Sequence, residues 1–388
     1  MNNALQMLLG KKGLPGLLIL AFILLVLFPL TMDVDSLNLT GRFLAFAFVA
    51  VGLVLAWGYG GLLSLGQGLF FGIGGYAMAM YLKLEASTPE ATAIQTTPGI
   101  PDFMDWNQIT ALPWFWEPFH SLTFTVLAIL TLPALFAAFI GFALFTRRVS
   151  GVFFAIITQA MVTIATILVI GQQGYTGGVN GITDLRTLKG WDIHTDQALV
   201  VFYFATVVLL FAVIALGMWV LSTKYGRILM ATRDQENRIR YSGYSVAYFK
   251  IFIFALAGFM SGIGGAMFTL QVGFMSPSII GIIPSIEFVI FAAVGGRLSL
   301  LGAVYGSLLV GYARVTFAEA FPQLWLFLIG AVFIAVVMFA PYGLAGLYNT
   351  HVRPRVEAFL VRMGWRPGAP PSDTPRAIDP QAAQEARK

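Results

Sequence analysis

Long apolar runs separated by short polar segments dominate this chain. A helix of about 20 apolar residues crosses the hydrocarbon core of a bilayer, and about ten runs approach that length. We therefore predict an all-α polytopic membrane protein with about ten transmembrane helices, at residues 13–32, 42–58, 62–82, 121–145, 151–171, 198–221, 250–272, 282–296, 299–318 and 323–341. The turns at Gly58–Gly61 and Gly295–Arg297 are very tight.

Basic residues are distributed unevenly between the two sides that these helices define. If the N-terminus is cytoplasmic, the outer side holds only five of the 23 Lys and Arg residues, namely Arg42, Lys83, Arg186, Lys189 and Arg314. Cytoplasmic loops of membrane proteins carry an excess of Lys and Arg. The pattern predicts that both termini are cytoplasmic, and it explains the net charge of +5 without a nucleic-acid partner.

Composition supports a membrane protein and narrows its chemistry. Hydrophobic residues make up 58% of the chain and charged residues 11%, whereas about a quarter of a soluble domain is charged. The chain has no cysteine, which excludes a disulfide framework and a thiolate nucleophile. Lys11 and Lys12 precede the first apolar run, as in a signal peptide, but no small-residue cleavage site follows, so we expect an uncleaved helix.

The polar segments suggest a simple organisation. Residues 1–12 form a cytoplasmic N-terminus and residues 13–345 a transmembrane domain. Within that domain, residues 83–120 form a proline-containing external loop and residues 222–249 a charged cytoplasmic loop. Residues 346–388 form a cytoplasmic tail, and its Pro-, Ala- and charge-rich composition predicts disorder from about residue 364.

A glycine-rich stretch, residues 57–76, is the first candidate for a solute path. Glycine weakens a helix interior by roughly 1 kcal/mol relative to alanine, so the stretch needs compensation from close packing, as at Gly68-x-x-x-Gly72. Broken backbone is tolerated in a membrane where it is buried or lines a cavity. One interpretation is that a path is lined by Ser64, Gln67, Phe70 and Phe71; the other is helix packing alone.

Two further spans carry polar candidates. Gln159 and Thr163 fall on one face of the span at 151–171, and a buried Gln needs a partner or a wet cavity. Glu287 is a carboxylate within a span, which suggests a functional site. Because Glu287 lies near the outer end of its span, it can alternatively reach water or pair with Arg314.

The charged cytoplasmic loop is predicted to contain a short helix from about 227 to 241, stopped at Gly243 by a left-handed cap. It mixes both signs of charge with exposed aromatic residues, which favours docking into a groove of another protein. A solvated surface helix is the alternative. The residues of interest are Arg233, Asp234, Glu236, Arg238, Arg240, Tyr241 and Gly243.

Motifs for catalysis and for nucleotide binding do not occur in the sequence. There is no G-x-x-x-x-G-K-[ST], H-E-x-x-H or G-x-S-x-G, and the three histidines are far apart. We therefore expect no enzymatic activity, no metal site and no cofactor.

Several of these segments together resemble the membrane permeases of ABC importers of the branched-chain amino acid type. The matching stretches, in order over most of residues 40–345, are Gly60–Gly75, Thr176–Gly181, Gly226–Gly243 and Ala293–Arg297. The M-type branch of that family fits best. Within it, similarity to the urea-importer permease lies in Pro101–Met104, Leu112–Trp116, Ile156–Ala160 and Arg233–Tyr244.

This resemblance implies a location and a set of partners. The protein would lie in the bacterial inner membrane, as a heterodimer with a homologous second permease. Two cytoplasmic ATP-binding subunits would dock on the loop at 222–249, and a periplasmic solute-binding protein would deliver solute. Family loops often carry paired alanines where this chain has Arg238 and Ile239, a departure that matches the urea branch.

Three classes of function remain for comparison. The first is an ABC permease subunit that moves urea or a related small amide by alternating access; its alternative solute is a branched-chain or other amino acid. The second is a stand-alone urea or amide channel, in which the charged loop would have no role. The third is a membrane enzyme, for which the chain lacks a nucleophile–base pair.

Overall fold

The structure is a computed structural model, and it describes residues 16–340 and 343–347. Regular structure in these residues is almost entirely helical, and the α-helices are α2 (Phe28–Thr31), α3 (Val34–Leu53), α4 (Gln67–Ala86), α5 (Asp102–Trp106), α6 (Leu122–Phe145), α7 (Val152–Gly171), α8 (Gln173–Thr176), α9 (Asp196–Ser222), α10 (Lys224–Asp234), α11 (Glu236–Tyr241), α12 (Val246–Val272), α13 (Pro277–Ile280), α14 (Ile282–Gly295), α15 (Leu300–Ala320), α16 (Trp325–Phe339) and α17 (Gly343–Leu347). Two π-helical stretches, η1 (Ile23–Leu27) and η2 (Val54–Tyr59), and a 3-10 helix, η3 (Glu117–His120), accompany them. Strands β1 (Thr187–Leu188) and β2 (Trp191–Asp192) form an antiparallel ribbon.

Six of the described helices are long and apolar enough to cross a membrane: Val34–Tyr59, Leu122–Phe145, Val152–Gly171, Asp196–Ser222, Val246–Val272 and Leu300–Ala320. Shorter apolar helices occupy Gly16–Thr31, Ile282–Gly295 and Phe327–Val336. These helices support a polytopic all-α membrane protein. The number of ten crossings and the cytoplasmic termini stay predictions. The N-terminal segment 1–12 and the tail from about residue 364 lie outside the described residues.

The centre of the bundle is formed by α3, α4, α12 and α14. Phenylalanine rings from all four helices pack together with centroids 5.2–6.2 Å apart; they are Phe46, Phe71, Phe268, Phe288 and Phe291. Helices α6, α7 and α9, by contrast, expose many large apolar side chains. Such exposed apolar faces suit contact with lipid or with another subunit.

Glycines allow the central helices to approach closely. A Cβ on Gly74 of α4 would overlap the backbone of Gly262 on α12, and a Cβ on Gly265 would overlap the Phe71 carbonyl. Gly302 and Gly306 of α15 lie equally close to the backbone of α14. Close backbone contact through small residues is a usual way for helices to associate in membranes.

The second predicted span begins earlier than its hydropathy indicated. Helix α3 begins at Val34 because the Asp33 carboxylate caps it, accepting a hydrogen bond from the Ser36 backbone N–H at 3.3 Å. Polar residues that precede the apolar run in the sequence, among them Asn38 and Thr40, belong to this helix and are buried inside the bundle. The helix continues as η2 to Tyr59. The prediction of 42–58 was therefore eight residues short at its start.

The third predicted span, 62–82, was wrong at both ends. Residues 60–66 are irregular, so the hairpin at Gly58–Gly61 is a longer segment than expected, and α4 occupies Gln67–Ala86. The predicted external loop at 83–120 accordingly begins after Ala86. Lys83 is one of the buried residues of α4, a position that hydropathy alone assigned to the loop.

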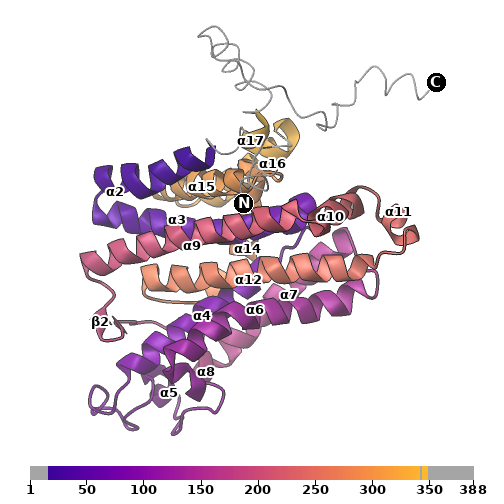
Figure 1. Ribbon diagram of the computed structural model, residues 1–388. Coiled ribbons are helices and arrows are strands. Elements are labelled where there is room, and N and C mark those ends of the chain that lie inside the picture. Colours follow the sequence, from indigo (N-terminus) through magenta and orange to yellow (C-terminus); the bar gives the residue numbers. More distant parts are fainter. Residues whose placement is uncertain (1–15, 341–342, 348–388) are drawn as a thin grey trace, which may run out of the picture. The chain divides into compact units, whose positions relative to one another are not determined.

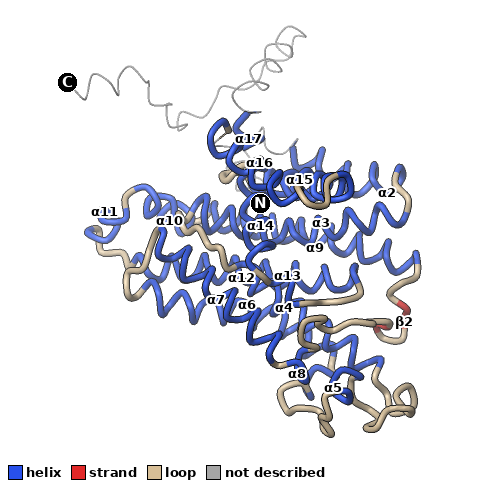
Figure 2. The backbone as a smooth tube through the Cα atoms, turned by 180° about the vertical axis from the view of Figure 1, so that it is seen from behind, coloured by secondary structure: helices blue, strands red, loops and turns tan. Residues whose placement is uncertain are grey.

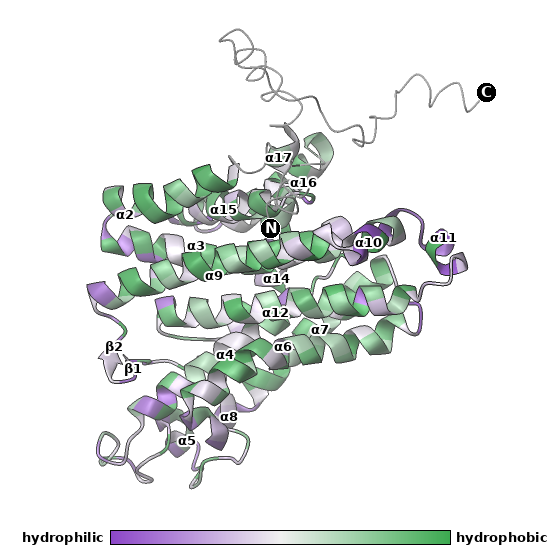
Figure 3. Ribbon diagram, viewed as in Figure 1, coloured by the Kyte–Doolittle hydropathy of each residue, from purple (hydrophilic) through white to green (hydrophobic). Residues whose placement is uncertain are grey.

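The two ends of the bundle differ in character. Helices α10 and α11 project from one end, whereas α5, α8 and the β1–β2 ribbon lie at the other (Figure 1). At the end with α5, α8 and β2, long loops connect these short elements (Figure 2). Hydrophilic residues gather at α10 and α11, and the helices between the two ends are mostly hydrophobic (Figure 3).

Candidate functional site

The irregular residues 60–66 lead from η2 into the interior of the bundle. The backbone N–H of Leu65 donates to Oγ1 of Thr158 at 3.1 Å, and Ser64 Oγ accepts from the Gly66 N–H at 3.2 Å. Thr158 lies well inside α7 rather than at its end, so α4 begins within the bundle. Irregular backbone at this depth is tolerated where protein buries it or a cavity solvates it.

A second interruption faces the first, where Gly281 separates α13 from α14. A Cβ on Gly68 would overlap the Ile280 carbonyl and would lie 2.5 Å from Ser285 Oγ, and a Cβ on Gly72 would lie 2.7 Å from Ile280 Cδ1. The helix face with Gly68 and Gly72 therefore packs directly against the segment around Ile280 that precedes α14. The N-termini of α4 and α14 meet at one place, which we call the helix junction.

Two buried polar groups at the helix junction lack hydrogen-bond partners. Gln67 accepts a hydrogen bond from Ser261 Oγ at 2.9 Å through its Oε1, but its Nε2 has no partner. Ser285 Oγ also has none, and both side chains are fully buried. An unpaired buried polar group costs about 1–3 kcal/mol. Helix N-termini carry partial positive charge, so the junction offers donors and positive dipole ends to an oxygen acceptor.

The predicted pathway residues divide into two groups. Ser64, Gln67, Phe70 and Phe71 lie at or beside the helix junction and are buried; Phe70 packs edge-on against Phe254 at 5.4 Å. Gln159 and Thr163 lie on a partly exposed part of α7, where the Thr163 hydroxyl donates to the Gln159 carbonyl at 3.1 Å.

Thr158, rather than Gln159, is the polar α7 residue that contacts the irregular segment. Ser285 was missed in the sequence, although the neighbouring Gly281 and Pro284 are the kind of residues that interrupt a helix.

Glu287 of α14 forms a buried ion pair. Its Oε2 lies 2.7 Å from Nη1 of Arg314 on α15, and the Glu287 side chain is only 4% exposed. The other carboxylate oxygen, Oε1, has no hydrogen-bond partner. The Arg314 guanidinium also lies 5.3 Å from the centre of the Trp325 ring. Of the two alternatives left open by the sequence, pairing with Arg314 is the one that the structure contains.

At the α10–α11 end, Arg233 joins α10 to the end of η2. Its Nη1 donates to the Gly58 carbonyl at 2.7 Å, and its Nε pairs with the Asp234 carboxylate at 2.8 Å. Gly58 in turn packs directly on the Arg297 carbonyl, and the Tyr59 hydroxyl donates to the Leu298 carbonyl at 2.7 Å. The turns at Gly58–Gly61 and Gly295–Arg297 are therefore in contact with each other, next to α10.

The predicted single helix at 227–241 consists of two helices, because Gln235 adopts an extended backbone (φ −147°, ψ 77°) between α10 and α11. Glu236 ties α11 to α12: its two carboxylate oxygens lie 2.7 Å from Arg240 and 2.7 Å from Lys250. Arg238 and Tyr241 are exposed, Tyr241 by 90%. The left-handed stop at Gly243 is confirmed by its φ of +86°.

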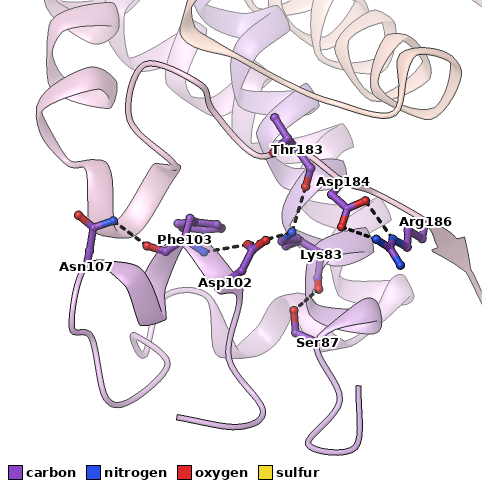
Figure 4. A network of polar contacts seen from close by, with 8 residues as sticks. All are labelled: Lys83, Ser87, Asp102, Phe103, Asn107, Thr183, Asp184 and Arg186. Carbon is purple, nitrogen blue, oxygen red and sulfur yellow. Dashed lines mark hydrogen bonds and ion pairs between the residues drawn. The ribbon is translucent and has the colours of Figure 1, made fainter. Parts of the chain in front are cut away.

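The opposite end is held by a polar network that centres on Lys83 (Figure 4). Lys83 Nζ lies 2.9 Å from the Asp102 carboxylate and donates to the Thr183 carbonyl at 3.1 Å. The network thereby ties α5 and the segment around residue 183 to the end of α4. The nearby pair of Asp184 and Arg186, at 2.9 Å, is far more exposed.

Two carboxyl groups at this end have lowered pKa values. The hydrogen bond and charge of Arg186 hold the pKa of Asp184 below its usual value. Hydrogen bonds from the Thr97 hydroxyl and from the backbone N–H groups of Thr97 and Thr96 lower the pKa of Asp105. Both groups are therefore carboxylates at neutral pH, and the loop carrying Asp105 is closed by hydrogen bonds to its charged form.

Comparison with known proteins identifies the family. A family model described as "Branched-chain amino acid transport system / permease component" matches residues 36–337. The high-affinity branched-chain amino acid transport system permease protein LivM of Escherichia coli K12 is 25% identical over 357 residues, covering 86% of this chain and 74% of that protein. LivM of Salmonella typhimurium LT2 is 24% identical over similar shares, 86% and 74%.

A relative that matches a shorter part of the chain is the autoinducer 2 import system permease protein LsrC of Yersinia pseudotuberculosis serotype O:1b, 28% identical over 51% of this chain and 60% of its own length. No solved structure matches the chain significantly. Because the family model spans most of the sequence, the chain belongs to the family of permease components of branched-chain amino acid transport systems, the membrane subunits of ABC importers.

Proposed function

We propose that this permease subunit carries a branched-chain or similar small amino acid across the bacterial inner membrane. The observation that carries the proposal is the family match over residues 36–337, together with relatives named as branched-chain amino acid permeases. These relatives support the amino acid interpretation better than the urea interpretation that the sequence motifs favoured. As a permease subunit, the chain works with ATPase and binding-protein partners.

The helix junction is the part of the solute path that we propose contacts the amino acid. The unpaired Gln67 Nε2 and the Ser285 hydroxyl are donors, and the N-termini of α4 and α14 supply positive dipole ends. A carboxylate is the group that such an arrangement binds best. Interrupted helices of this kind form the binding sites of several transporters. Because Gln67 and Ser285 are fully buried, the proposed path would have to open at the junction for a solute to reach them.

Glu287 is a second polar group of α14, on the side of the helix that faces Arg314 rather than Gly68. Its Oε1 is buried without a partner, whereas Arg314 occupies only Oε2. A solute amine would reach Oε1 only along that side of α14, away from the helix junction. Because this oxygen is unpaired, we keep Glu287 in the proposed path, with Ser64, Gln67, Phe70 and Phe71. Gln159 and Thr163 are proposed to border it from α7.

We propose that α10 and α11 form the coupling surface for an ATPase subunit. The exposed residues Arg238 and Tyr241 lie on the outside of this projection, and Glu236, Arg240 and Gly243 fix its shape. Arg233, which pairs with Asp234, links it to Gly58 near the end of η2. Movement of the projection would therefore reach the irregular segment that precedes the helix junction.

The proposed coupling surface also suggests how the chain is oriented in the membrane. We propose that the α10–α11 end faces the cytoplasm and that both termini lie there, in agreement with the excess of Lys and Arg on that side. The end with α5, α8 and the β1–β2 ribbon then faces the periplasm and receives the solute-binding protein. The exposed apolar faces leave room for a homologous second permease in a heterodimer.

Urea remains a second candidate solute because the stretches Pro101–Met104 and Leu112–Trp116 resemble the urea-importer permease. Urea is neutral, and its carbonyl oxygen also suits the donors at the helix junction. Unlike an amino acid, it has no ammonium group for Glu287. The two candidates therefore differ in their dependence on that carboxylate.

The test is uptake of labelled leucine and labelled urea by vesicles that contain this chain with the subunits encoded beside it. We expect ATP-dependent leucine uptake, lowered about tenfold by Ser285→Ala, since a hydrogen bond to a charged group contributes about 1.5–3 kcal/mol. Ser307→Ala is the matched control, because within the described part of the chain that buried hydroxyl bonds to the Ala303 carbonyl of its own helix.

The other outcomes each select a different function. ATP-dependent uptake of urea without leucine would replace the amino acid by urea and leave the permease role intact. Flux of either solute through this chain alone, without ATP, would instead indicate a channel. Equal loss of uptake in Ser285→Ala and Ser307→Ala would remove the helix junction from the path.

A further inference from the structure

A cavity of about 220 Å³ lies at the α10–α11 end, where α6 ends and α12 begins. It is several times the volume of one water molecule, about 30 Å³. Phe145 of α6 and Val246 and Ala247 of α12 supply apolar lining, whereas the charged lining comes from α11, from Lys250 of α12 and from the turn between α6 and α7. The lining residues are Phe145, Thr146, Arg148, Val149, Glu236, Arg240, Tyr244, Ser245, Val246, Ala247 and Lys250.

The cavity is positively charged. Three cationic side chains line it, Arg148, Arg240 and Lys250, against one carboxylate, Glu236. Glu236 is shared between Arg240 and Lys250, at 2.7 Å from each, so it does not neutralise the set. The first turn of α12 adds to the positive potential, because Ser245 makes no side-chain capping bond to that 27-residue helix and the N–H groups of a first turn carry partial positive charge.

Arg148 occupies a backbone position that usually belongs to glycine. Its φ is +61°, and it ends α6 in a Schellman motif, in which the Val149 N–H donates to the Leu144 carbonyl at 3.0 Å and the Arg148 N–H donates to the Phe145 carbonyl at 3.1 Å. Glycine, or sometimes asparagine, is the residue that such a position favours. An arginine there is disfavoured by its backbone, so its presence points to a use for the side chain.

The location of the cavity selects the source of the anion. It lies at the ends of two candidate membrane spans, α6 and α12, and beside the start of a third, α7. The first residues of α7, Val152 and Phe153, are 73% and 74% exposed, as expected for side chains that face acyl chains. The phosphate groups of lipids lie at this level of a bilayer, and basic pockets between transmembrane helices bind such head groups.

We propose that this cavity binds the phosphate group of an anionic phospholipid. Arg148 and Arg240 donate to the phosphate oxygens, a pairing for which the planar guanidinium is well suited. Lys250 and the first turn of α12 contribute further positive charge to the lining. This assignment does not depend on which solute the protein carries.

The test measures binding of phosphatidylglycerol and of phosphatidylcholine to the purified full-length chain in detergent, by native mass spectrometry. We expect phosphatidylglycerol to bind at least about tenfold more tightly, since only it brings a net charge to the guanidinium groups. Arg148→Gln should lower that affinity about tenfold. Arg147→Gln is the matched control, because Arg147 is the exposed neighbour that does not line the cavity.

A second variant separates lipid binding from folding. Arg148→Gly suits the positive φ, so it should keep or raise the melting temperature while it lowers phosphatidylglycerol binding as much as Arg148→Gln does. Equal affinity for the two lipids, or equal loss in the Arg147 and Arg148 variants, would overturn the proposal. Displacement of phosphatidylglycerol by millimolar inorganic phosphate would reassign the cavity to free phosphate and overturn the lipid assignment.

Discussion

Gly265 and Gly74 show how little space single residues have at the centre of this bundle. Each faces the backbone of the opposite helix so closely that a methyl group would overlap it. Backbone atoms cannot move aside as the end of a long side chain can. These two glycines are therefore fixed by packing, whereas Gly171, at the end of α7, has nothing within 4 Å of its Cβ position.

Gly265→Ala is accordingly expected to destabilise the protein by about 1–3 kcal/mol, the usual effect of overpacking. Gly171→Ala serves as the control and should leave stability unchanged or slightly raised, because alanine favours a helix. Thermal unfolding in detergent, followed by tryptophan fluorescence, measures both. Unfolding of the two variants at the same temperature would contradict the tight contact between α4 and α12.

Lys83 is a second residue whose contribution to stability depends on a buried contact, its ion pair with Asp102. Its side chain is 5% exposed and pairs with Asp102, so Asp102→Asn would leave a buried ammonium without its carboxylate. Removal of one partner of a buried pair typically costs about 3–5 kcal/mol, and the partial exposure of Asp102 reduces this toward the lower value. Asp184→Asn breaks a nearby exposed pair and should cost less than about 1 kcal/mol.

Unfolding in denaturant, with each Asn variant compared with the unsubstituted chain, tests this difference. An equal effect of the two substitutions would mean that the Lys83–Asp102 pair does not hold α5 against α4. The comparison is direct because both aspartates lie at the same end of the bundle, in two neighbouring but separate ion pairs (Figure 4).

At the scale of elements, the link between α10 and η2 is the main mechanical feature. Arg233 bonds to Gly58 at the point where η2 ends, and the irregular residues 60–66 follow at once. A short chain segment therefore separates the proposed ATPase contact from the helix junction. π-helical turns are rare and frequently occur at functional sites.

Arg233→Gln should therefore weaken coupling without preventing assembly. In the reconstituted transporter we expect ATP hydrolysis to continue while solute uptake per ATP falls several-fold, since the bond from α10 to Gly58 is lost. Arg227→Gln changes the same charge on an exposed residue of α10 and should keep normal coupling. Loss of ATPase binding in Arg233→Gln would show instead that Arg233 belongs to the docking surface.

At the scale of the whole molecule, the described residues separate two polar ends by a mostly hydrophobic middle (Figure 3). This separation is what a bilayer requires, because charged groups are costly in hydrocarbon. The proposed orientation puts α10 and α11 in the cytoplasm and α5 in the periplasm. The absence of cysteine from the chain makes this orientation easy to measure.

Single cysteines at exposed positions of the two ends should react from opposite sides of the membrane. Ile94→Cys, at a fully exposed position beyond α4, should react with an impermeant maleimide in intact spheroplasts. Tyr241→Cys, on α11, should react only after the membrane is opened. The unsubstituted chain provides the background, and the reverse pattern of labelling would invert the orientation.

Much of the element pattern was predictable from local sequence. The predicted spans at 121–145, 151–171 and 198–221 match α6, α7 and α9 closely, because apolar length and short polar breaks mark a membrane helix directly. The stop at Gly243 was likewise predictable, since a left-handed cap is a local property of glycine. The start of α3 was not, because its buried polar residues resemble a loop in a hydropathy pattern.

The identity of the chain as a membrane permease subunit was available from its apolar runs and its family motifs. The partnership of Gln67 with Ser261, of Glu287 with Arg314 and of Arg233 with Gly58 was decided by tertiary structure. Each pair joins residues far apart in the sequence, and only the packing of α4, α14 and α10 brings them together. A sequence pattern reports which face of a helix is apolar, whereas the neighbour that completes a buried polar group depends on how helices assemble.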